Sequence, residues 1–333
     1  MKKIKENKVK WGILGVGDVC EVKSAPAMNI VPDSEIVAVM RRNGEKAKDY
    51  AQRHHVPKWY DNADALINDP DINAIYVATP PNIHAEMAIK VAAAGKPVYV
   101  EKPMAKTYKE CLLMIEAFKK AGVPLYVAYY RRALPNFLFV KEQIENGVIG
   151  DVRMVKIEMY KPLQPDIITH QDNHWRVNPE IAGGGYFYDL ASHQLDMLDF
   201  LFGPIKYAEG RAANQGKLYK ADDIVTASFG FDSGILGTGS WCFSTGKCSD
   251  KEVTTIIGST GQIEFGTFAD TSVTITTDED GKQYYPFLMP KHIQTPMIDL
   301  VVKDLLGTGH CPCTGIIGAR TNWVMEQMCQ KLS

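Results

Sequence analysis

The sequence predicts an α/β protein with two domains: a doubly wound parallel sheet, then an α+β domain whose sheet is open and mainly antiparallel. Three observations lead to this prediction. A glycine turn follows a short apolar run at residues 11–14, apolar runs alternate with amphipathic stretches up to residue 128, and strand-like runs separated by glycines dominate after residue 220. The length of 333 residues supports two cores, because a single core stops growing near about 250 residues.

The glycine turn is the first candidate site. Gly15 and Gly17 stand two residues apart where the first predicted strand ends and a helix begins. Such a turn brings backbone N–H groups and the positive end of a helix dipole close to an anion, as in the pyrophosphate site of Rossmann domains. We expect cofactor contacts at Gly15, Gly17, Asp18 and Val19. The third fingerprint position holds Cys20 instead of glycine or alanine, and cysteine is small enough to fit.

The other elements of the first domain predict a sheet covered by helices on both faces. Strands are expected at 36–40, 74–78, 98–100 and 125–128, and helices at 25–30, 45–54, 83–94 and 107–121. Nearly all the strands are apolar without alternation, as strands buried on both faces must be. Gly95 and Gly122 are placed to end two of the helices. Ligands of such folds bind at the carboxyl ends of the strands, where the glycine turn lies.

The end of the second strand indicates which dinucleotide binds. An NAD site carries a carboxylate about twenty residues after the glycines, which bonds the ribose hydroxyls. Here the chain has Met40, Arg41, Arg42 and Asn43. Two guanidinium groups can hold a 2′-phosphate that a carboxylate would repel, so we predict NADP as the preferred cofactor and NAD as the alternative. In the alternative, Arg41 stacks on the adenine and Arg42 faces solvent.

A proline-rich loop follows the third strand at the same edge of the sheet. Pro80 and Pro81 end the strand and bend the chain, and Asn82 is suited to cap the next helix. A loop at this edge would lie along the cofactor, whereas the simpler alternative is a helix start and nothing more. The expected cofactor contacts are Thr79, Pro80, Asn82 and His84.

The fourth strand is followed by Glu101, Lys102 and Pro103. A lysine at the carboxyl end of a central strand projects toward the nicotinamide end of a bound dinucleotide, and a proline restrains the backbone there. We therefore predict that Lys102 is catalytic, and that Glu101 and Lys102 both contact the cofactor. The alternative is an exposed ion pair worth less than about 1 kcal/mol.

The second half of the chain predicts a strand at 152–160 with one apolar face, a helix at 188–202, strands at 223–231, 234–243, 251–257, 262–265 and 272–277, and closing helices at 293–306 and 319–332. Strands in series favour antiparallel pairing. With a boundary near residues 129–135, we assign residues 1–130 to a dinucleotide-binding domain and residues 131–333 to a substrate-binding and oligomerisation domain.

Asp189 and His193 are the candidate acid–base pair of the second domain. They are four residues apart on the predicted helix, so both stand on one face, where the carboxylate can orient or charge the imidazole. A histidine titrates near neutrality and can exchange a proton with a hydroxyl that becomes a carbonyl. The alternative is that Asp189 caps the helix and His193 is a core residue.

Together these motifs resemble the glucose-fructose oxidoreductase, inositol dehydrogenase and MocA family of NAD(P)-dependent oxidoreductases. The segments that carry the resemblance span most of the chain and are Gly15–Gly17, Ala78–His84, Val100–Pro103, Trp175–Arg176 and Gly183–His193. The resemblance implies an N-terminal Rossmann domain and a C-terminal α/β domain. The open sheet of that second domain would carry the substrate site on one face and the contact of a homodimer or homotetramer on the other.

The resemblance also implies hydride transfer between nicotinamide and a hydroxyl or carbonyl group. Lys102 and His193 would take the acid–base roles, with the proton donor left open, and Asp189 would steer His193. Arg176 would touch both cofactor and substrate, with a structural ion pair as its alternative role. A polar pocket with aromatic walls suits a sugar, sugar derivative or cyclitol as the substrate. Aromatic dihydrodiols are the alternative substrate class. The expected substrate contacts are Lys102, Tyr130, Trp175, Arg176, Asp189 and His193.

Two other functions stay open. Some members of the family resemble the enzymes but act as dinucleotide-sensing regulators, although a regulator needs no acid–base pair. Others are glycosidases that retain NAD and oxidise their sugar transiently. The pair Arg41 and Arg42 argues against a retained NAD.

Composition excludes several classes of partner. The net charge of -2 provides no basic field for nucleic acid or an anionic membrane. The chain lacks an apolar run of the roughly 20 residues that span a bilayer, and residues 1–10 lack the apolar segment of a signal peptide. Seven cysteines, an odd number, indicate reduced thiols in the cytoplasm. No metal is expected at His310–Cys313, which lacks a second ligand pair, or at the predicted loop with His170 and His174.

Overall fold

The computed structural model describes residues 3–162 and 175–330. The chain forms two compact units, and each of them is built from two segments: Met1–Arg132 with Pro290–Ala319, and Ala133–Met289 with Arg320–Ser333. Each unit contains its own sheet. The predicted pair His170 and His174 lies outside the described residues.

The first unit contains a six-stranded parallel sheet in the order β3-β2-β1-β4-β5-β6, the strand order of a Rossmann fold. The strands are β1 (Val9–Leu14), β2 (Ser34–Met40), β3 (Lys58–Tyr60), β4 (Ala74–Val77), β5 (Val98–Val100) and β6 (Leu125–Val127). The helices are α1 (Asp18–Val22), α2 (Ala25–Ile30), α3 (Gly44–Arg53), α4 (Ala63–Ile67), α5 (His84–Ala93), α6 (Tyr108–Ala121) and α10 (Thr295–Leu306). The predicted class of the first domain is therefore confirmed.

Local sequence explains where several of these helices begin and end. A capping box of Thr107 and Glu110 starts α6, and Gly122, with a φ of 70°, ends it as predicted. Asn82 does not cap α5, so that prediction was wrong: a 3-10 turn at Pro81–Ile83 precedes the helix, and no side chain caps its first turn. The tight turn encloses Asn82, so this side chain does not stand at the cap position.

Two elements of the first unit were not predicted. The strand β3 and the helix α4 lie between α3 and β4. β3 has three residues, is partly exposed and stands at the edge of the sheet. An edge strand needs no apolar run on both faces, so the pattern that predicted the other strands is missing here.

The second unit contains an eight-stranded sheet in the order β14-β13-β12-β11-β7-β10-β9-β8. All neighbours are antiparallel except β7 and β10, which are parallel. The strands are β7 (Val152–Pro162), β8 (Ile205–Ala213), β9 (Ile224–Phe231), β10 (Leu236–Thr245), β11 (Lys251–Gly258), β12 (Gly261–Phe265), β13 (Val273–Thr277) and β14 (Gly281–Tyr285). The predicted open, mainly antiparallel sheet is confirmed, although β8 and β14 were not predicted.

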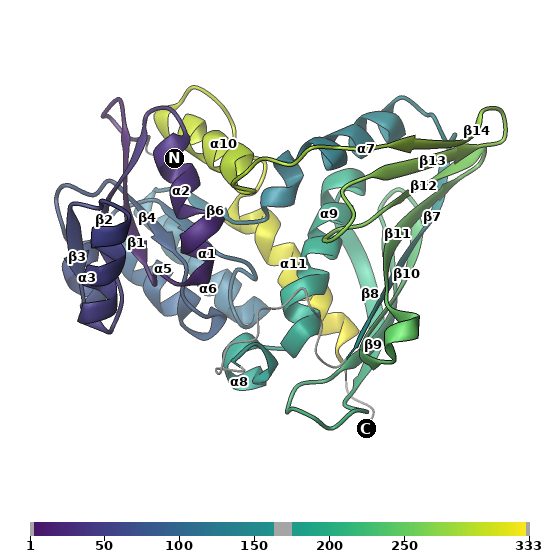
Figure 1. Cartoon of the computed structure of the whole chain (residues 1–333), viewed down its shortest axis with the longest axis horizontal. Coiled ribbons are helices and arrows are strands. Elements are labelled where there is room, and N and C mark those ends of the chain that lie inside the picture. Colours follow the sequence, from purple (N-terminus) through teal and green to yellow (C-terminus); the bar gives the residue numbers. More distant parts are fainter. Residues whose placement is uncertain (1–2, 163–174, 331–333) are drawn as a thin grey trace. The chain divides into compact units, whose positions relative to one another are not determined.

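One face of this sheet is covered and the other is open (Figure 1). The helices α7 (Pro135–Glu145) and α9 (Ser192–Phe202) cover the inner face. There Phe137 packs on Phe265 at 5.7 Å, and Trp241 is fully buried. Two further helices are α8 (Pro179–Ala182) and α11 (Gly315–Met328); α11 starts one turn before the predicted position. In the described part of the chain, no helix combines the length and apolar character needed to cross a bilayer.

Candidate active site

The glycine turn has the geometry of an anion cradle. Gly15 has a φ of 90°, and a Cβ atom there would lie 2.7 Å from the Thr79 side chain, so glycine is required by both conformation and space. Its N–H donates to the carbonyl oxygen of Met40 at 2.9 Å, which ties the turn to the end of β2. At Gly17 the space is open, because a Cβ atom would meet only the Gly15 carbonyl oxygen at 4.0 Å. A ligand can therefore approach the backbone closely at Gly17.

Cys20, at the third fingerprint position, is a packing residue. The side chain is fully buried, and burial raises the pKa of its thiol to about 12. The carbonyl oxygen of Cys20 accepts a hydrogen bond of 2.8 Å from the Tyr50 hydroxyl on α3. The helix α1 then ends at Val22, and a second helix begins at Ala25.

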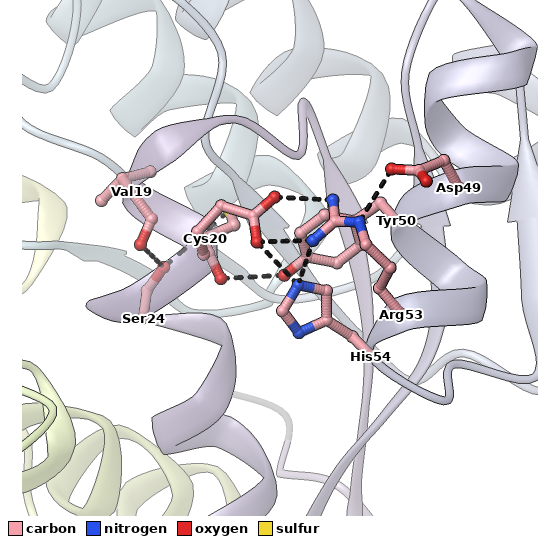
Figure 2. A network of polar contacts seen from close by, with 8 residues as sticks. Val19, Cys20, Ser24, Asp49, Tyr50, Arg53 and His54 are labelled. Carbon is pink, nitrogen blue, oxygen red and sulfur yellow. Dashed lines mark hydrogen bonds and ion pairs between the residues drawn. The ribbon is translucent and has the colours of Figure 1, made fainter.

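A polar network ties α1, the helix that follows the glycine turn, to α3 (Figure 2). The carboxylate of Glu21 pairs with the Arg53 guanidinium at 2.9 Å and with the His54 Nε2 atom at 2.7 Å. Arg53 also pairs with Asp49, one turn earlier on α3, at 2.8 Å. The sequence did not predict this network, because nothing local to α1 indicates which distant cation meets Glu21. Hydrogen bonding to Arg53 lowers the pKa of Glu21 to about 2.

We predict that the Glu21 contacts contribute stability that depends on pH. Glu21→Gln should lower the free energy of unfolding near pH 7 by at most about 1 kcal/mol, because 37% of the Glu21 side chain is exposed and water screens the pair. Because the pKa of Glu21 is lowered in the folded state, the ionised carboxylate stabilises the fold at pH values above its ordinary pKa of 4.5. This stabilisation is lost as the pH falls toward about 2. Urea unfolding of both proteins across this pH range measures the difference.

Glu279→Gln is the matched control for Glu21→Gln, because Glu279 is an exposed carboxylate in the turn between β13 and β14 and lies outside the first turn of any helix. Its effect on unfolding should stay near zero at every pH. A stability difference between wild type and Glu21→Gln that is the same at neutral and acidic pH would contradict the assigned role of the carboxylate.

The proline-rich loop is held by His84. The imidazole is fully buried, with Nε2 lying 2.6 Å from the Thr79 carbonyl oxygen and Nδ1 lying 3.1 Å from that of Pro103. Burial lowers the pKa of His84, and each of its two ring nitrogens faces a backbone carbonyl oxygen. His84 therefore connects the Thr79 loop to the segment that follows Lys102. The Thr79 Oγ1 atom is buried and has no hydrogen-bond partner in the described residues.

Lys102 follows a carboxylate that the first unit holds in place. Glu101 is 8% exposed and accepts hydrogen bonds from the Tyr76 hydroxyl at 2.6 Å, from Gln294 Nε2 at 2.8 Å and from the Lys102 N–H at 3.2 Å. Lys102 itself is half-buried, and its peptide bond to Pro103 is cis. Gln294 immediately precedes α10, nearly two hundred residues along the chain from Glu101, and the sequence did not predict this contact.

Arg41 and Arg42 leave the sheet with their side chains in solvent. The Arg41 N–H donates to the Tyr60 carbonyl oxygen at 3.2 Å, which continues the pairing of β2 with β3. Asn43 caps α3 by accepting from the Lys46 N–H at 3.0 Å. Both arginines are exposed, and no ion pair between either of them and another described residue is present. The backbone is fixed on both sides, and the guanidinium groups stay available to a ligand.

The second unit brings Arg176 and Asp189 together. Trp175 and Arg176 lie in a 3-10 turn, where the guanidinium stands 4.5 Å from the centre of the Trp175 ring. The Arg176 Nε atom lies 3.4 Å from Asp189 Oδ2, and both side chains are partly exposed. The ion pair proposed as an alternative role for Arg176 is thus present.

Asp189 and His193 do not lie on one continuous α-helix. Residues Phe187–Ala191 form a π-helical turn, and α9 begins at Ser192, so the prediction of a single helix over 188–202 was wrong at its start. Single π-turns occur frequently at functional sites. The His193 ring is 4% exposed and packs edge-to-face on Phe268 with ring centres 5.7 Å apart.

The remaining predicted residues divide between the units. Tyr130 belongs to the first unit, is 7% exposed and lies under the Arg131 guanidinium at 4.9 Å. Lys102 also belongs to the first unit, whereas Arg176, Asp189 and His193 belong to the second. The convergence of Lys102 and His193 on one oxygen stays a prediction.

A parallel sheet in the Rossmann order, with a glycine turn at its carboxyl edge, defines a dinucleotide-binding protein. Two family models match the chain and show to which family of dinucleotide-binding proteins it belongs. Residues 9–129 match the oxidoreductase family with an NAD-binding Rossmann fold, and residues 137–264 match the GFO/IDH/MocA C-terminal domain. The chain belongs to the GFO/IDH/MocA family of NAD(P)-dependent oxidoreductases, which confirms the resemblance found in the sequence.

Three known proteins illustrate this relationship. Oxidoreductase P35 of Formosa agariphila is 38% identical over 325 residues, which cover 97% of this chain and 99% of that protein. Myo-inositol 2-dehydrogenase of Thermotoga maritima is 28% identical over 291 residues, with coverage of 85% and 84%. The structure of aldose-aldose oxidoreductase from Caulobacter crescentus, complexed with glycerol, is similar with a TM-score of 0.84 and 25% identity over 96% of both chains.

Proposed function

We propose that this enzyme transfers a hydride between NADP and a hydroxyl or carbonyl carbon of a sugar, sugar derivative or cyclitol. The observation that carries the proposal is the placement of Lys102. It follows β5 at the carboxyl edge of the sheet, next to a buried Glu101 that Tyr76 and Gln294 hold in place. Two relatives support the substrate class, because one is named for myo-inositol and the other for aldoses.

The residues at the edge of the first sheet fit a dinucleotide. The open space at Gly17 suits a pyrophosphate, and the buried Thr79 Oγ1 atom, without a partner in the described part of the chain, suits a cofactor hydroxyl or amide. Arg41 and Arg42 are proposed to hold the 2′-phosphate, which supports NADP over NAD. In addition to contacting the cofactor, His84 and Glu101 are proposed to position the loops that carry Thr79 and Lys102. The proposed cofactor contacts are Gly15, Gly17, Asp18, Val19, Arg41, Arg42, Thr79, Pro80, Asn82, His84, Glu101, Lys102 and Arg176.

The bound cofactor supplies or accepts the hydride, and the chain's own residues manage the proton. In reduction, the substrate carbonyl carbon gains the hydride while its oxygen takes a proton from either the Lys102 ammonium or the His193 imidazolium. In oxidation, the neutral form of one of these groups, the Lys102 amine or the His193 imidazole, receives the hydroxyl proton. Asp189 is proposed to orient His193, and its ion pair with Arg176 restrains the carboxylate for that role. Tyr130, Trp175 and Arg176 would hold the other substrate hydroxyls.

The test is a nicotinamide absorbance assay of the whole enzyme with NADP and NAD over a panel of aldoses, cyclitols and other polyols. We expect turnover with at least one member of the panel. Absence of turnover together with dinucleotide binding would indicate a sensing protein. Release of an aryl leaving group without net change in cofactor absorbance would indicate a glycosidase.

We also propose that the outer face of the eight-stranded sheet is the contact of a homo-oligomer. Tyr207 and Leu236 are 51% and 55% exposed on this face. The Tyr207 ring lies over Gly230, since a Cβ atom there would be 2.3 Å from the ring, and Leu236 pairs with both Gly230 and Met154. An apolar row thus crosses four strands, and exposed apolar patches of this kind mark protein contacts.

Leu236→Arg is expected to reduce the oligomer to monomers, because a buried unpaired charge disfavours the contact. Sedimentation velocity of wild type and variant measures the change. Leu112→Arg is the matched control, since Leu112 is 46% exposed on α6 of the first unit. Identical sedimentation of wild type and Leu236→Arg would contradict this assignment.

The proposed compartment is the cytoplasm. The seven cysteines all lie in the described part of the chain, and none of them forms a disulfide there, as in proteins of reducing compartments. Burial raises the pKa of Cys311 and Cys329 to about 12, which keeps these thiols protonated. Fractionation of cells that produce the full chain tests this assignment.

A further inference from the structure

A partly buried carboxylate organises the loop between β12 and β13. Glu252, on β11, accepts hydrogen bonds from the backbone N–H groups of Thr267 at 2.8 Å and Phe268 at 3.1 Å, one on each carboxylate oxygen. The loop backbone lies close to this carboxylate, because a Cβ atom on Gly266 would be 3.3 Å from Glu252 Oε2. The position of Phe268 therefore depends on Glu252.

The same carboxylate contacts the helix that carries His193. Gln194 is the next residue on α9, is 1% exposed, and donates from Nε2 to Glu252 Oε1 at 3.3 Å. The Gln194 Oε1 atom accepts from the Trp241 indole N–H at 2.7 Å, inside the core of the inner face. Each of the polar atoms of the Gln194 amide thus has a defined partner.

Phe268, whose backbone is held by Glu252, contacts the His193 side chain directly. Its ring packs edge-to-face on the His193 ring, with centres 5.7 Å apart and planes at 74°. This geometry is a favourable one for aromatic pairs, and it restricts rotation of the imidazole about its side-chain bonds. Glu252 consequently reaches His193 by two routes, through Phe268 and through Gln194.

We propose that Glu252 is a positioning residue for His193, which it holds in its reactive orientation through Phe268 and Gln194. The proposal rests on the catalytic role proposed for His193. All of its residues belong to the second unit. A fixed imidazole plane matters because proton transfer requires the donor nitrogen to lie within hydrogen-bond reach of the substrate oxygen.

The substitution Glu252→Gln is a sharp test because no orientation of the amide can replace the carboxylate. With the NH₂ group at the Oε2 position, the Phe268 N–H loses its acceptor; at the Oε1 position, both Thr267 N–H and Gln194 lose theirs. We expect kcat to fall by about 10-fold, since misplacement by about an ångström costs as much as 10²-fold. KM for the dinucleotide should be unchanged, and the pH profile of kcat should shift.

Three further proteins make the test decisive. Glu279→Gln removes an exposed carboxylate in the turn between β13 and β14 and should leave all parameters unchanged. Phe268→Tyr keeps the ring and should retain kcat and its pH profile. Phe268→Leu loses the ring and should reproduce the Glu252→Gln effect, which keeps the proposal testable if Glu252→Gln does not fold.

A second measurement tests the positioning role of Glu252 independently of whether the protein has the proposed enzymatic function. Imidazole ¹⁵N resonances of the folded protein, with His193 identified by its loss in His193→Ala, should shift in Glu252→Gln and not in Glu279→Gln. Unchanged His193 resonances together with an unchanged kcat and pH profile would overturn the positioning role. If wild type lacks turnover, or His193→Ala retains it, the proposed function fails, and the His193 resonances still decide whether Glu252 positions the ring.

Discussion

Replacing His193 with alanine is expected to lower kcat of hydride transfer by about 10²- to 10⁴-fold, the range that a general acid or base contributes. His193 lies on α9 of the second unit, whereas the glycine turn and both arginines belong to the first. Dinucleotide binding should therefore be retained in this variant. Lys102→Met should cause a loss of similar size, because the substrate oxygen loses its other proposed donor.

Steady-state absorbance kinetics measures the loss in these variants, and calorimetric titration with NADP measures cofactor affinity separately. His310→Ala is the control for the imidazole, since this side chain is 80% exposed. Lys119→Met is the control for the ammonium group, because Lys119 is exposed on α6. Full turnover in either His193→Ala or Lys102→Met would refute the proposed acid–base roles.

The double variant Arg41→Ala/Arg42→Ala is expected to lose its preference for NADP. A hydrogen bond to a charged group contributes about 1.5–3 kcal/mol, and about 1.4 kcal/mol corresponds to a factor of ten. The ratio of kcat/KM for NADP to that for NAD should thus fall by about 10- to 100-fold for each arginine that contacts the 2′-phosphate. Because the exposed guanidinium groups pair with no other described residue, their removal should leave stability unchanged.

Arg153→Ala, which removes an exposed arginine on β7 of the second unit, is the matched control for cofactor preference. The contribution of the two arginines should also weaken as salt concentration rises, because ions screen exposed charges. A preference ratio that is equal in wild type and the double variant would assign cofactor selection to other residues. A wild type that prefers NAD would exclude the proposed phosphate site.

Much of the fold followed from patterns local to each element. The strands β1, β4, β5 and β6 are short apolar runs without alternation, and all of their residues except Lys10 are buried. Gly122 was predicted to end α6 and does so, whereas the capping box at its start was found in the structure. The unpredicted strands β3 and β14 stand at sheet edges, where only part of a strand is buried. Their sequences therefore lack the apolar signal, and only neighbouring strands define them as part of a sheet.

In the candidate site, too, some features were predicted from local sequence and others were defined only by the structure. The motif residues Gly15, Lys102 and His193 were recognised because glycine, lysine and histidine carry distinctive chemistry at the ends of predicted elements. The π-helical start before α9 was not predicted, because its residues have no composition that separates a π-turn from an α-turn. Their hydrogen bonding is set by what packs around the turn.

The sequence by itself determined the Rossmann core, the glycine turn and the basic end of β2. These features depend on backbone conformation, apolar periodicity and charge within a few residues, which the order of amino acids specifies directly. Only the tertiary structure decided that Gln294 holds Glu101, that Arg53 holds Glu21, and that Glu252 reaches Phe268 and Gln194. Each of these contacts joins polar groups from separate elements, so the partner of each polar side chain is selected by the folded chain around it.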